Sequence, residues 1–380
     1  MDKITVYALP VFFVLMACEF AYGLATRKNT YRLSDSLSSL SQGLLSQLVA
    51  GITQLFQIGL YTLTFRSVAL FARSPIWHAW YGWLIAIVLF DFCDYWLHRM
   101  GHESAVMWAA HAVHHQSQHF NLSTALRQES TVALLGWPFY LPMAVLGVAP
   151  EQFALAGLIV LLYQFWIHTE HIGKLGWFDR VFSSPSNHRV HHAVNDQYLD
   201  KNYGGMLVIW DRLFGTFAEE REPCVYGTRT QLRNWNPLWA VAVGYSDIAK
   251  LARRTRRWSD KLRLWFKPPG WLPDDLKVAA STVPYDLQAA AQSYDPQLSR
   301  GRRWFAAAQF LQLMAATGSY LWFADDLSFG QTVLVVAPMV AGLWSLGMLL
   351  EGRLKIAQIC WVNLASAGVA LAIWLSLYPR

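Results

Sequence analysis

The feature that most constrains this chain is a series of apolar runs that are long enough to form bilayer-crossing helices. A helix needs about 20 mostly apolar residues to cross roughly 30 Å of hydrocarbon. Eight runs are candidates: 4–25, 44–72, 79–98, 131–149, 151–168, 304–323, 330–350 and 354–378. The sequence therefore predicts an all-α, polytopic membrane protein, built as a transmembrane helical bundle.

Composition supports this class and excludes several others. Charged residues make up 15% of the chain, against about 25% in ordinary globular proteins, and hydrophobic residues make up 54%. The 19 tryptophans belong to a type that gathers at membrane–water interfaces. Disorder, collagen-like repeats and a disulfide scaffold are excluded. The four cysteines form no CxxC pair, so no thiolate metal site is expected.

The net charge of +6 is concentrated in one part of the chain. Of the 31 Lys and Arg residues, 20 lie between Lys174 and Arg303, in a stretch without a long apolar run. Loops that are rich in Lys and Arg remain on the cytoplasmic side of a membrane, and no nucleic-acid-binding motif is present. We expect an integral, multi-pass protein of the bacterial inner membrane or the endoplasmic reticulum, with no nucleic-acid partner.

The runs and the basic stretch divide the chain into four parts. We expect N-terminal transmembrane helices over 1–78, a catalytic domain with histidine motifs over 79–220, a basic cytoplasmic segment over 221–303, and C-terminal transmembrane helices over 304–380. Lys3 is the only basic residue before the first apolar run, and this run is longer than the core of a signal peptide, so we expect it to be a retained span.

Ten of the 12 histidines fall into four groups. The groups are an HxxxH (His98, His102), an HxxHH (His111, His114, His115), the pair His168 and His171, and a second HxxHH (His188, His191, His192). Residues at i, i+3 and i+4 share one face of a helix, so each HxxHH presents three imidazoles together. All four groups lie at or just beyond the predicted cytoplasmic ends of spans. We therefore predict a histidine-rich, metal-binding cap on the cytoplasmic face.

Ten imidazoles are too many for one metal ion, whereas two ions with four or five nitrogens each fit the count. Imidazole binds iron, zinc, copper and nickel, so the ligand type does not choose between these metals. Metal-bound histidines usually donate their second N–H to a carboxylate or a carbonyl. Five acidic residues are candidates for this role: Asp91, Asp94, Glu103, Glu170 and Asp196. Asp94 lies one helical turn before His98, which favours it among them.

The histidine motifs resemble those of the fatty acid hydroxylase/sterol desaturase superfamily of membrane di-iron enzymes. Segments 121–128, 162–170 and 188–217 are more specifically similar to its ether-cleaving branch, the alkylglycerol monooxygenases. The resemblance is strong over roughly 80–220. His171 departs from the branch, where an apolar residue is expected, and 221–303 matches poorly.

The resemblance implies two iron ions that react with O₂, bound by the eight histidines of the HxxxH and HxxHH motifs and by His168, with His171 as a further candidate ligand. Zinc in place of iron is an alternative for the purified protein. The implied reaction hydroxylates the carbon next to the ether oxygen of an alkylglycerol taken from the membrane, which yields a fatty aldehyde and a glycerol derivative. Tetrahydrobiopterin, or another external electron donor, supplies two electrons. The candidate catalytic residues are Glu103, Asp94 and Asn187. The candidate cofactor-binding residues are Asn121, Arg127 and Gln128. Helix capping or fold maintenance is an alternative role for the polar side chains.

Three alternatives remain open at this point. The chain is consistent with another lipid oxidase of the superfamily: a sterol oxidase or desaturase, a fatty acid hydroxylase or a carotenoid hydroxylase. A metal transporter is a second alternative, although transporter sites typically lie near the bilayer midplane and not at one face. An inactive lipid-binding scaffold is the third, and intact metal motifs argue against it.

Overall fold

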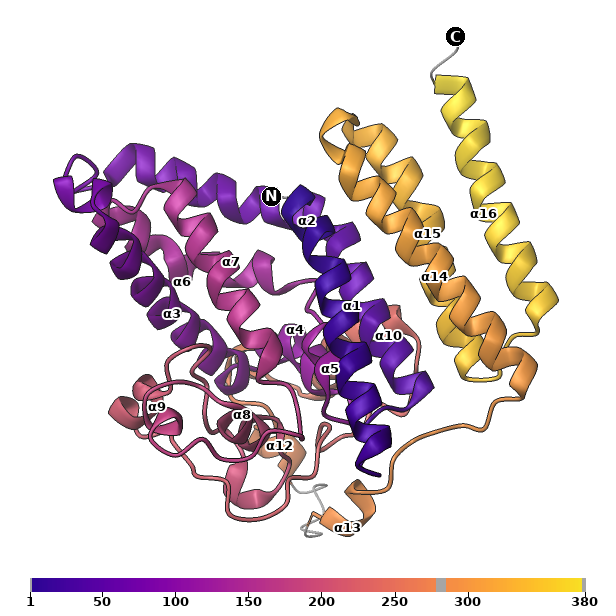
Figure 1. The fold of residues 1–380 in the computed structure, drawn as a ribbon, viewed down its shortest axis with the longest axis horizontal. Helices are drawn as coiled ribbons and strands as arrows, with labels where there is room; N and C mark the ends of the chain where they lie inside the picture. Colours follow the sequence, from indigo (N-terminus) through magenta and orange to yellow (C-terminus); the bar gives the residue numbers. More distant parts are fainter. Residues whose placement is uncertain (1, 278–284, 378–380) are drawn as a thin grey trace.

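The computed structural model describes residues 2–277 and 285–377, and this part of the chain is helical, without a β-strand (Figure 1). Two isolated β-bridges pair Phe182 with Leu207 and Ala193 with Tyr226. The prediction of an all-α fold is confirmed for the described residues. The longer helices are α1 (Asp2–Ala25), α2 (Leu33–Val68), α3 (Trp80–Glu103), α4 (Ala105–His115), α6 (Val132–Leu146), α7 (Pro150–Trp166), α10 (Pro237–Arg254), α11 (Trp258–Phe266), α14 (Arg300–Phe323), α15 (Phe329–Leu350) and α16 (Ile356–Leu377).

Three described helices are both long and apolar enough to cross a bilayer. They are α3, α15 and the 356–376 stretch of α16, while residues 9–25 of α1 and helix α6 are apolar but shorter. Only 6% of the α16 span is fully buried within the protein, so most of its residues keep some surface open to lipid. The remaining predicted runs correspond to helices α2, α7 and α14. The last predicted run extends to residue 378, which lies outside the described residues.

Helix α2 is longer than the apolar run that predicts it. It begins at Leu33 and not near residue 44, and its first turns are rich in serine. Ser34, Ser38, Ser39 and Gln42 are buried there. The Arg127 guanidinium donates to the Ser38 hydroxyl, and the Gln42 amide donates to the Pro237 carbonyl. Apolarity alone therefore misses the start of this helix.

Helix α2 joins two hydrophobic clusters. Its first half contributes Leu44 and Leu48 to a cluster with α14 and α15. Its second half contributes Tyr61 to a cluster with α3, α6 and α7, where the Tyr61 ring stacks on Phe153 at 4.0 Å. The Tyr61 hydroxyl also donates to the Val148 carbonyl at 2.9 Å. These contacts make α2 the scaffold on which both helical groups are placed (Figure 1).

Helix α4, which carries three of the histidines, is held between α3 and α10. Close packing with α10 requires glycine at position 244, since a Cβ atom there would lie 2.8 Å from the Ala109 Cα. Ser104 ends α3 and precedes α4, so the chain turns sharply and brings the two histidine-bearing helices together.

A loop-rich segment, residues 167–236, covers the ends of α3 and α7 (Figure 1). It contains the short helices α8 (Pro185–His192) and α9 (Ile209–Phe214). Helix α8 is only eight residues long, yet its start is well defined, since Ser184 caps it and Pro185 occupies its first turn. The remaining short elements are η1 (Pro75–His78), α5 (Leu122–Ala125), η2 (Phe178–Arg180), η3 (Asp196–Tyr198), α12 (Asp274–Lys277), α13 (Leu287–Ala290) and η4 (Ala324–Asp326).

Candidate metal centre

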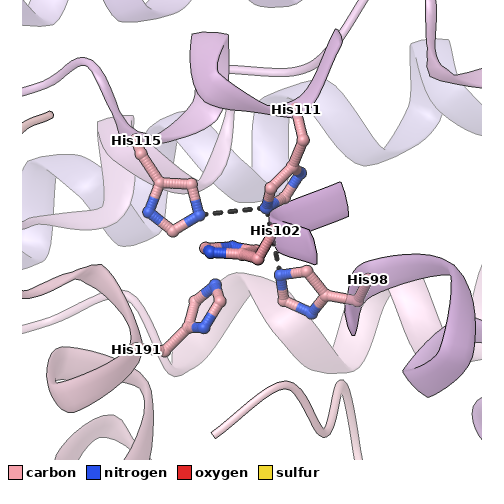
Figure 2. A group of neighbouring side chains, drawn as sticks. All are labelled: His98, His102, His111, His115 and His191. Atoms are coloured by element: carbon pink, nitrogen blue, oxygen red, sulfur yellow. Dashed lines mark hydrogen bonds between the residues drawn. The ribbon is translucent and has the colours of Figure 1, made fainter. Parts of the chain in front are cut away.

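Nine histidines converge in two adjacent groups, and within each group the ligand nitrogens lie within 4.8 Å of one another. The five-histidine group contains His98, His102, His111, His115 and His191. The four-histidine group contains His114, His168, His188 and His192. Figure 2 shows the first group, with four rings arranged around that of His102. Apart from the half-buried His98, each of these residues is at most 8% exposed.

The two HxxHH motifs are divided between the groups in opposite ways. On α4, the i, i+4 pair His111 and His115 enters the five-histidine group, while His114 enters the four-histidine group. On α8, the i, i+4 pair His188 and His192 enters the four-histidine group, while His191 enters the five-histidine group. Each motif therefore links both groups, and α4 and α8 together fix the two positions relative to each other.

The ring nitrogens face one another in a way that fits bound metal ions. A neutral imidazole has a single N–H. In His114 and His168 the Nδ1–H is used, because it donates to the carbonyls of Arg127 at 3.0 Å and Gln164 at 2.7 Å. Their Nε2 atoms therefore both present lone pairs, although they lie 3.1 Å apart. Two nitrogens bound at about 2.1 Å to one ion lie roughly 3.0–3.4 Å apart, so a shared cation explains the contact.

The same argument applies to the five-histidine group. His98 donates its Nδ1–H to the Tyr203 carbonyl at 2.7 Å, and its Nε2 lies 3.1 Å from the Nε2 of His111. The Nε2 atoms of His102 and His191 are buried and have no hydrogen-bond partner. Buried polar atoms without a partner are costly unless a ligand satisfies them. The nine imidazoles therefore form two donor sets, each suited to holding one metal ion.

Burial keeps the imidazoles of the centre in the form that binds metal. It lowers the pKa of His114 from 6.5 to about 4. Burial, together with the neighbouring imidazoles, also lowers the pKa values of His115, His168, His188 and His192 well below the ordinary value. At neutral pH these rings are uncharged, so their lone pairs are available to metal ions.

Two short segments orient several of the rings through alternate residues. In residues 127–129, the Arg127 carbonyl accepts from His114, and the Glu129 carboxylate accepts from the Nδ1 of His111 at 2.6 Å. In residues 201–203, the Lys201 carbonyl accepts from His191 at 3.0 Å and the Tyr203 carbonyl accepts from His98. Each segment therefore fixes the orientation of two histidine rings.

Both segments are anchored by buried polar side chains. The Arg127 guanidinium donates to the Val113 carbonyl at 2.6 Å and to the Gln116 side chain at 3.0 Å, which ties residues 127–129 to the end of α4. Asn202 donates from Nδ2 to the carbonyls of Asn187 and Ala218, and it adopts a positive φ of 57° that asparagine tolerates.

A buried ion pair connects α8 to the loop that carries His168. Arg189 and Glu220 form a bidentate pair with both N–O distances at 2.7 Å, and Arg189 also donates to the carbonyls of Thr169 and Ile172. The Thr169 hydroxyl in turn donates to Glu19 of α1 at 2.5 Å. The bidentate pair with Glu220 fixes the Arg189 guanidinium. Its donation to the Thr169 and Ile172 carbonyls then ties α8 to the segment that follows His168.

The chain was compared with known proteins. The fatty acid hydroxylase family model matches residues 83–216. Alkylglycerol monooxygenase of Danio rerio is 34% identical over 93% of this chain and 78% of the relative, and that of Homo sapiens is 35% identical over 92% and 78%. The chain belongs to the alkylglycerol monooxygenase family.

This membership confirms the resemblance inferred from the sequence and makes the chain a membrane lipid monooxygenase. An ornithine lipid hydroxylase of Rhizobium tropici is a more distant relative, 30% identical over 37% of this chain and 43% of the relative. Comparison with solved structures finds no significant match.

In this alkylglycerol monooxygenase family member, the structure brings together nine of the ten predicted histidine ligands. His171 is not part of either group. Its ring packs edge-on against Tyr22 of α1, with the ring centroids 5.1 Å apart, and its buried Nε2 has no hydrogen-bond partner. The helical pattern does not extend to this residue, because α7 ends at Trp166 and the chain turns after His168.

The predicted catalytic residues lie near the centre without a hydrogen bond to its rings. Asp94 accepts from the Tyr140 hydroxyl at 2.8 Å and from Gln164 at 3.4 Å. Glu103 accepts from Arg99 at 2.8 Å, one turn earlier on α3. Asn187 donates from Nδ2 to the carbonyls of Asp179 and Phe182, which holds the loop before α8. Their catalytic roles remain predictions.

The predicted cofactor-binding residues are also engaged within the protein. Asn121 caps α5, accepting from the Ser123 backbone at 3.0 Å, and its amide donates to the Thr30 carbonyl. Gln128 donates to the Ala125 carbonyl at 2.7 Å. Arg127 anchors the 127–129 segment as described above. These contacts account for all three side chains without a cofactor, and binding of an electron donor by them remains a prediction.

The structure identifies two carboxylates that the sequence analysis did not propose. Glu129 contacts His111, and the Asp200 carboxylate lies 3.4 Å from the Nδ1 of His102. Burial alone would raise the pKa of Glu129, but its hydrogen bond with His111 brings this pKa below the ordinary value. Neither residue lies at a helical spacing from a histidine motif, so local periodicity offers no signal for them.

We expect acid to destabilise the metal-free protein. The folded state holds His114 with a pKa of about 4, whereas the unfolded chain binds a proton near pH 6.5. The unfolded state therefore gains protons first as the pH falls, and stability is lost between about pH 6.5 and 4. For His114 alone, this difference corresponds to roughly 3 kcal/mol of unfolding free energy.

Thermal melting of metal-free protein in detergent, followed by circular dichroism from pH 7.5 to 4.5, measures this effect. His114→Ala removes the group and should flatten part of the pH dependence. A melting temperature that stays constant down to pH 4.5 would contradict the expectation.

Proposed function

We propose that the chain is a di-iron monooxygenase that hydroxylates the carbon next to the ether oxygen of an alkylglycerol. O₂, two electrons and two protons give a hemiacetal and water. The hemiacetal then breaks its former ether C–O bond, which releases a fatty aldehyde and a glycerol derivative. The observation that carries the proposal is the division of nine buried imidazoles into groups of five and four in a chain whose relatives are named alkylglycerol monooxygenases.

The five-histidine and four-histidine groups would each hold one iron ion. Bound iron supplies the reactivity toward O₂ that side chains lack. The four-histidine group has fewer protein ligands, which favours it as the position where O₂ and substrate have access. Tetrahydrobiopterin, the donor that the family resemblance implies, or another external reductant would supply the electrons.

The chain's own residues prepare the site for this chemistry. The carbonyls of Tyr203, Arg127, Gln164 and Lys201 fix the orientation of four rings before any ligand binds. Such partners raise the basicity of the ligand. Loss of one typically weakens metal affinity by about 10–100-fold. The burial of eight of the nine histidines keeps bulk water from the ring nitrogens.

The substrate would reach the centre from the bilayer along α3. The first part of α3 exposes large apolar side chains, with Trp80 at 75% and Leu84 at 53% exposure. The same helix ends in the histidine-bearing turn that contains His98 and His102. An ether lipid whose chain lies against α3 would therefore have its polar end at the level of the metal centre.

We also propose that this end of the helices faces the cytoplasm in a multi-pass arrangement. Arg99 at the end of α3 lies beside His98, and the basic stretch Lys174–Arg303 contains the last histidine motif, residues 188–192. Arg353 and Lys355 lie between α15 and α16. The positive-inside rule predicts a cytoplasmic location for such loops.

A turnover assay tests the proposed reaction. Iron-loaded protein is mixed anaerobically with an alkylglycerol and tetrahydrobiopterin, O₂ is then admitted, and fatty aldehyde is followed by mass spectrometry. We expect aldehyde only when O₂ and the donor are both present. His114→Ala should lose the activity, because it removes a ligand, whereas His78→Ala, at an exposed histidine far from the motifs, should retain it.

Two bound irons without aldehyde would reject this substrate or donor. The same protein would then be tested with sterols, fatty acids and carotenoids, the substrates of the alternative lipid oxidases. Metal flux into vesicles without O₂ consumption would instead support a transporter.

A further inference from the structure

Glu129 makes a contact that sets it apart from the other partners of the histidine rings. Its carboxylate accepts the Nδ1–H of His111 at 2.6 Å, and its side chain is 18% exposed. Because Nδ1 is held by Glu129, the opposite ring nitrogen, Nε2, is turned into the five-histidine group. There it lies 3.1 Å from the Nε2 of His98 and 3.0 Å from the Nε2 of His115.

The two groups differ in the partners of their rings. Among the described residues, His114 and His168 of the four-histidine group donate to neutral backbone carbonyls. The five-histidine group has such carbonyl partners too, and in addition it has the Glu129 carboxylate. Asp200, beside His102, is more distant at 3.4 Å and is 64% exposed, so solvent screens its charge. Among the described residues, Glu129 is therefore the largely buried carboxylate that hydrogen-bonds to a ring of this centre.

We propose that Glu129 is a positioning residue that makes the five-histidine position the tighter of two unequal metal positions. The inference rests on the proposed function, because it requires that two metal ions bind. A carboxylate that accepts from a ligand histidine fixes the ring and increases its basicity. Its negative charge also attracts a divalent cation more strongly where solvent is excluded.

The hydrogen bond of Glu129 acts on a ring of one group only, that of His111, whereas its charge also reaches His114. Arg127 and Glu129 belong to one short segment, but they act on different groups: the Arg127 carbonyl on His114 and the Glu129 carboxylate on His111. Three hydrogen bonds from the Arg127 guanidinium, to Val113, Ser38 and Gln116, anchor the segment independently of Glu129. Substitution of Glu129 should therefore leave the Arg127 carbonyl, which accepts from His114, in place.

A cobalt(II) titration tests the inference without any turnover. Metal-free, full-length protein in detergent micelles is titrated with cobalt, and its ligand-field absorption reports each addition. Wild-type protein should bind two ions in two steps. Glu129→Leu removes both charge and acceptor, and should weaken the tighter step by about 10–100-fold. Glu129→Gln keeps the shape and the acceptor but not the charge, and should weaken that step less while changing its absorption spectrum.

The weaker step should change much less than the tighter step in both variants, because Glu129 hydrogen-bonds to His111 and acts on His114 through its charge alone. Glu219→Gln is the matched control, since Glu219 is an exposed partner of Lys174, and it should leave both steps unchanged. If Glu129→Leu does not fold, as judged by circular dichroism, the isosteric Glu129→Gln decides the result through the affinity and spectrum of the tighter step.

Different failures have different meanings. Two-step binding that is unchanged in the Glu129 variants, or a change in the weaker step instead, would overturn this inference and leave the proposed function standing. Wild-type protein that does not bind two metal ions would overturn the proposed function and this inference together.

Discussion

Replacing His168 with alanine should abolish aldehyde formation and leave the protein with one fewer metal ion. His168 supplies one of four nitrogens in the four-histidine group, and its Nε2 contacts those of His114 and His188 at 3.1 and 2.9 Å. Loss of a ligand should cost more than the roughly 10–100-fold that loss of an outer hydrogen-bond partner costs. Metal content by mass spectrometry and the turnover assay measure the two effects on the same preparation.

His171→Ala provides the matched comparison. His171 lies three residues after His168, but its ring packs against Tyr22 and is not part of either group. This variant should retain both metal ions and most of the activity. The assignment of ligands would be wrong if His171→Ala lost a metal ion, or if His168→Ala kept both.

The second large effect should come from Asp91→Leu, which we expect to destabilise the protein by roughly 3 kcal/mol or more. The Asp91 carboxylate is fully buried in α3. It accepts from the backbone of Met206 at 2.7 Å and Leu207 at 3.1 Å, and from the Trp210 indole at 2.9 Å. Leucine would leave these three donors buried without an acceptor, and each such group costs about 1–3 kcal/mol.

The loss should be visible as a lower melting temperature in detergent micelles. Metal affinity should fall as well, because residues 206–210 directly follow the segment whose Lys201 and Tyr203 carbonyls orient His191 and His98. Asp325→Asn, at an exposed position, should change stability by less than about 0.5 kcal/mol. Equal melting temperatures for Asp91→Leu and wild type would show that Asp91 does not hold this loop.

The carboxylates illustrate where sequence reasoning fails. Asp94 is one helical turn from His98, so periodicity favours it as the partner of a ligand ring. In the structure its oxygens instead accept from Tyr140 and Gln164, on α6 and α7. Glu129, in the loop between α5 and α6, reaches His111 because the Arg127 anchor directs that loop along the end of α4. A loop path of this kind depends on contacts between distant residues, which a single sequence does not display.

The sequence by itself determined the all-α class, the membrane character and the family, and it predicted two metal positions, because these depend on local properties. Apolar length sets the spans, and the i, i+3, i+4 spacing places histidines on one helix face. The tertiary structure alone decided the division into five and four ligands, the separation of His171, and the roles of Glu129 and Asp91. His98 and the carbonyl that orients it, that of Tyr203, are 105 residues apart in the chain. The packing of α3, α4, α8 and their loops brings such groups together. A local periodic pattern does not predict contacts between residues so far apart in the chain.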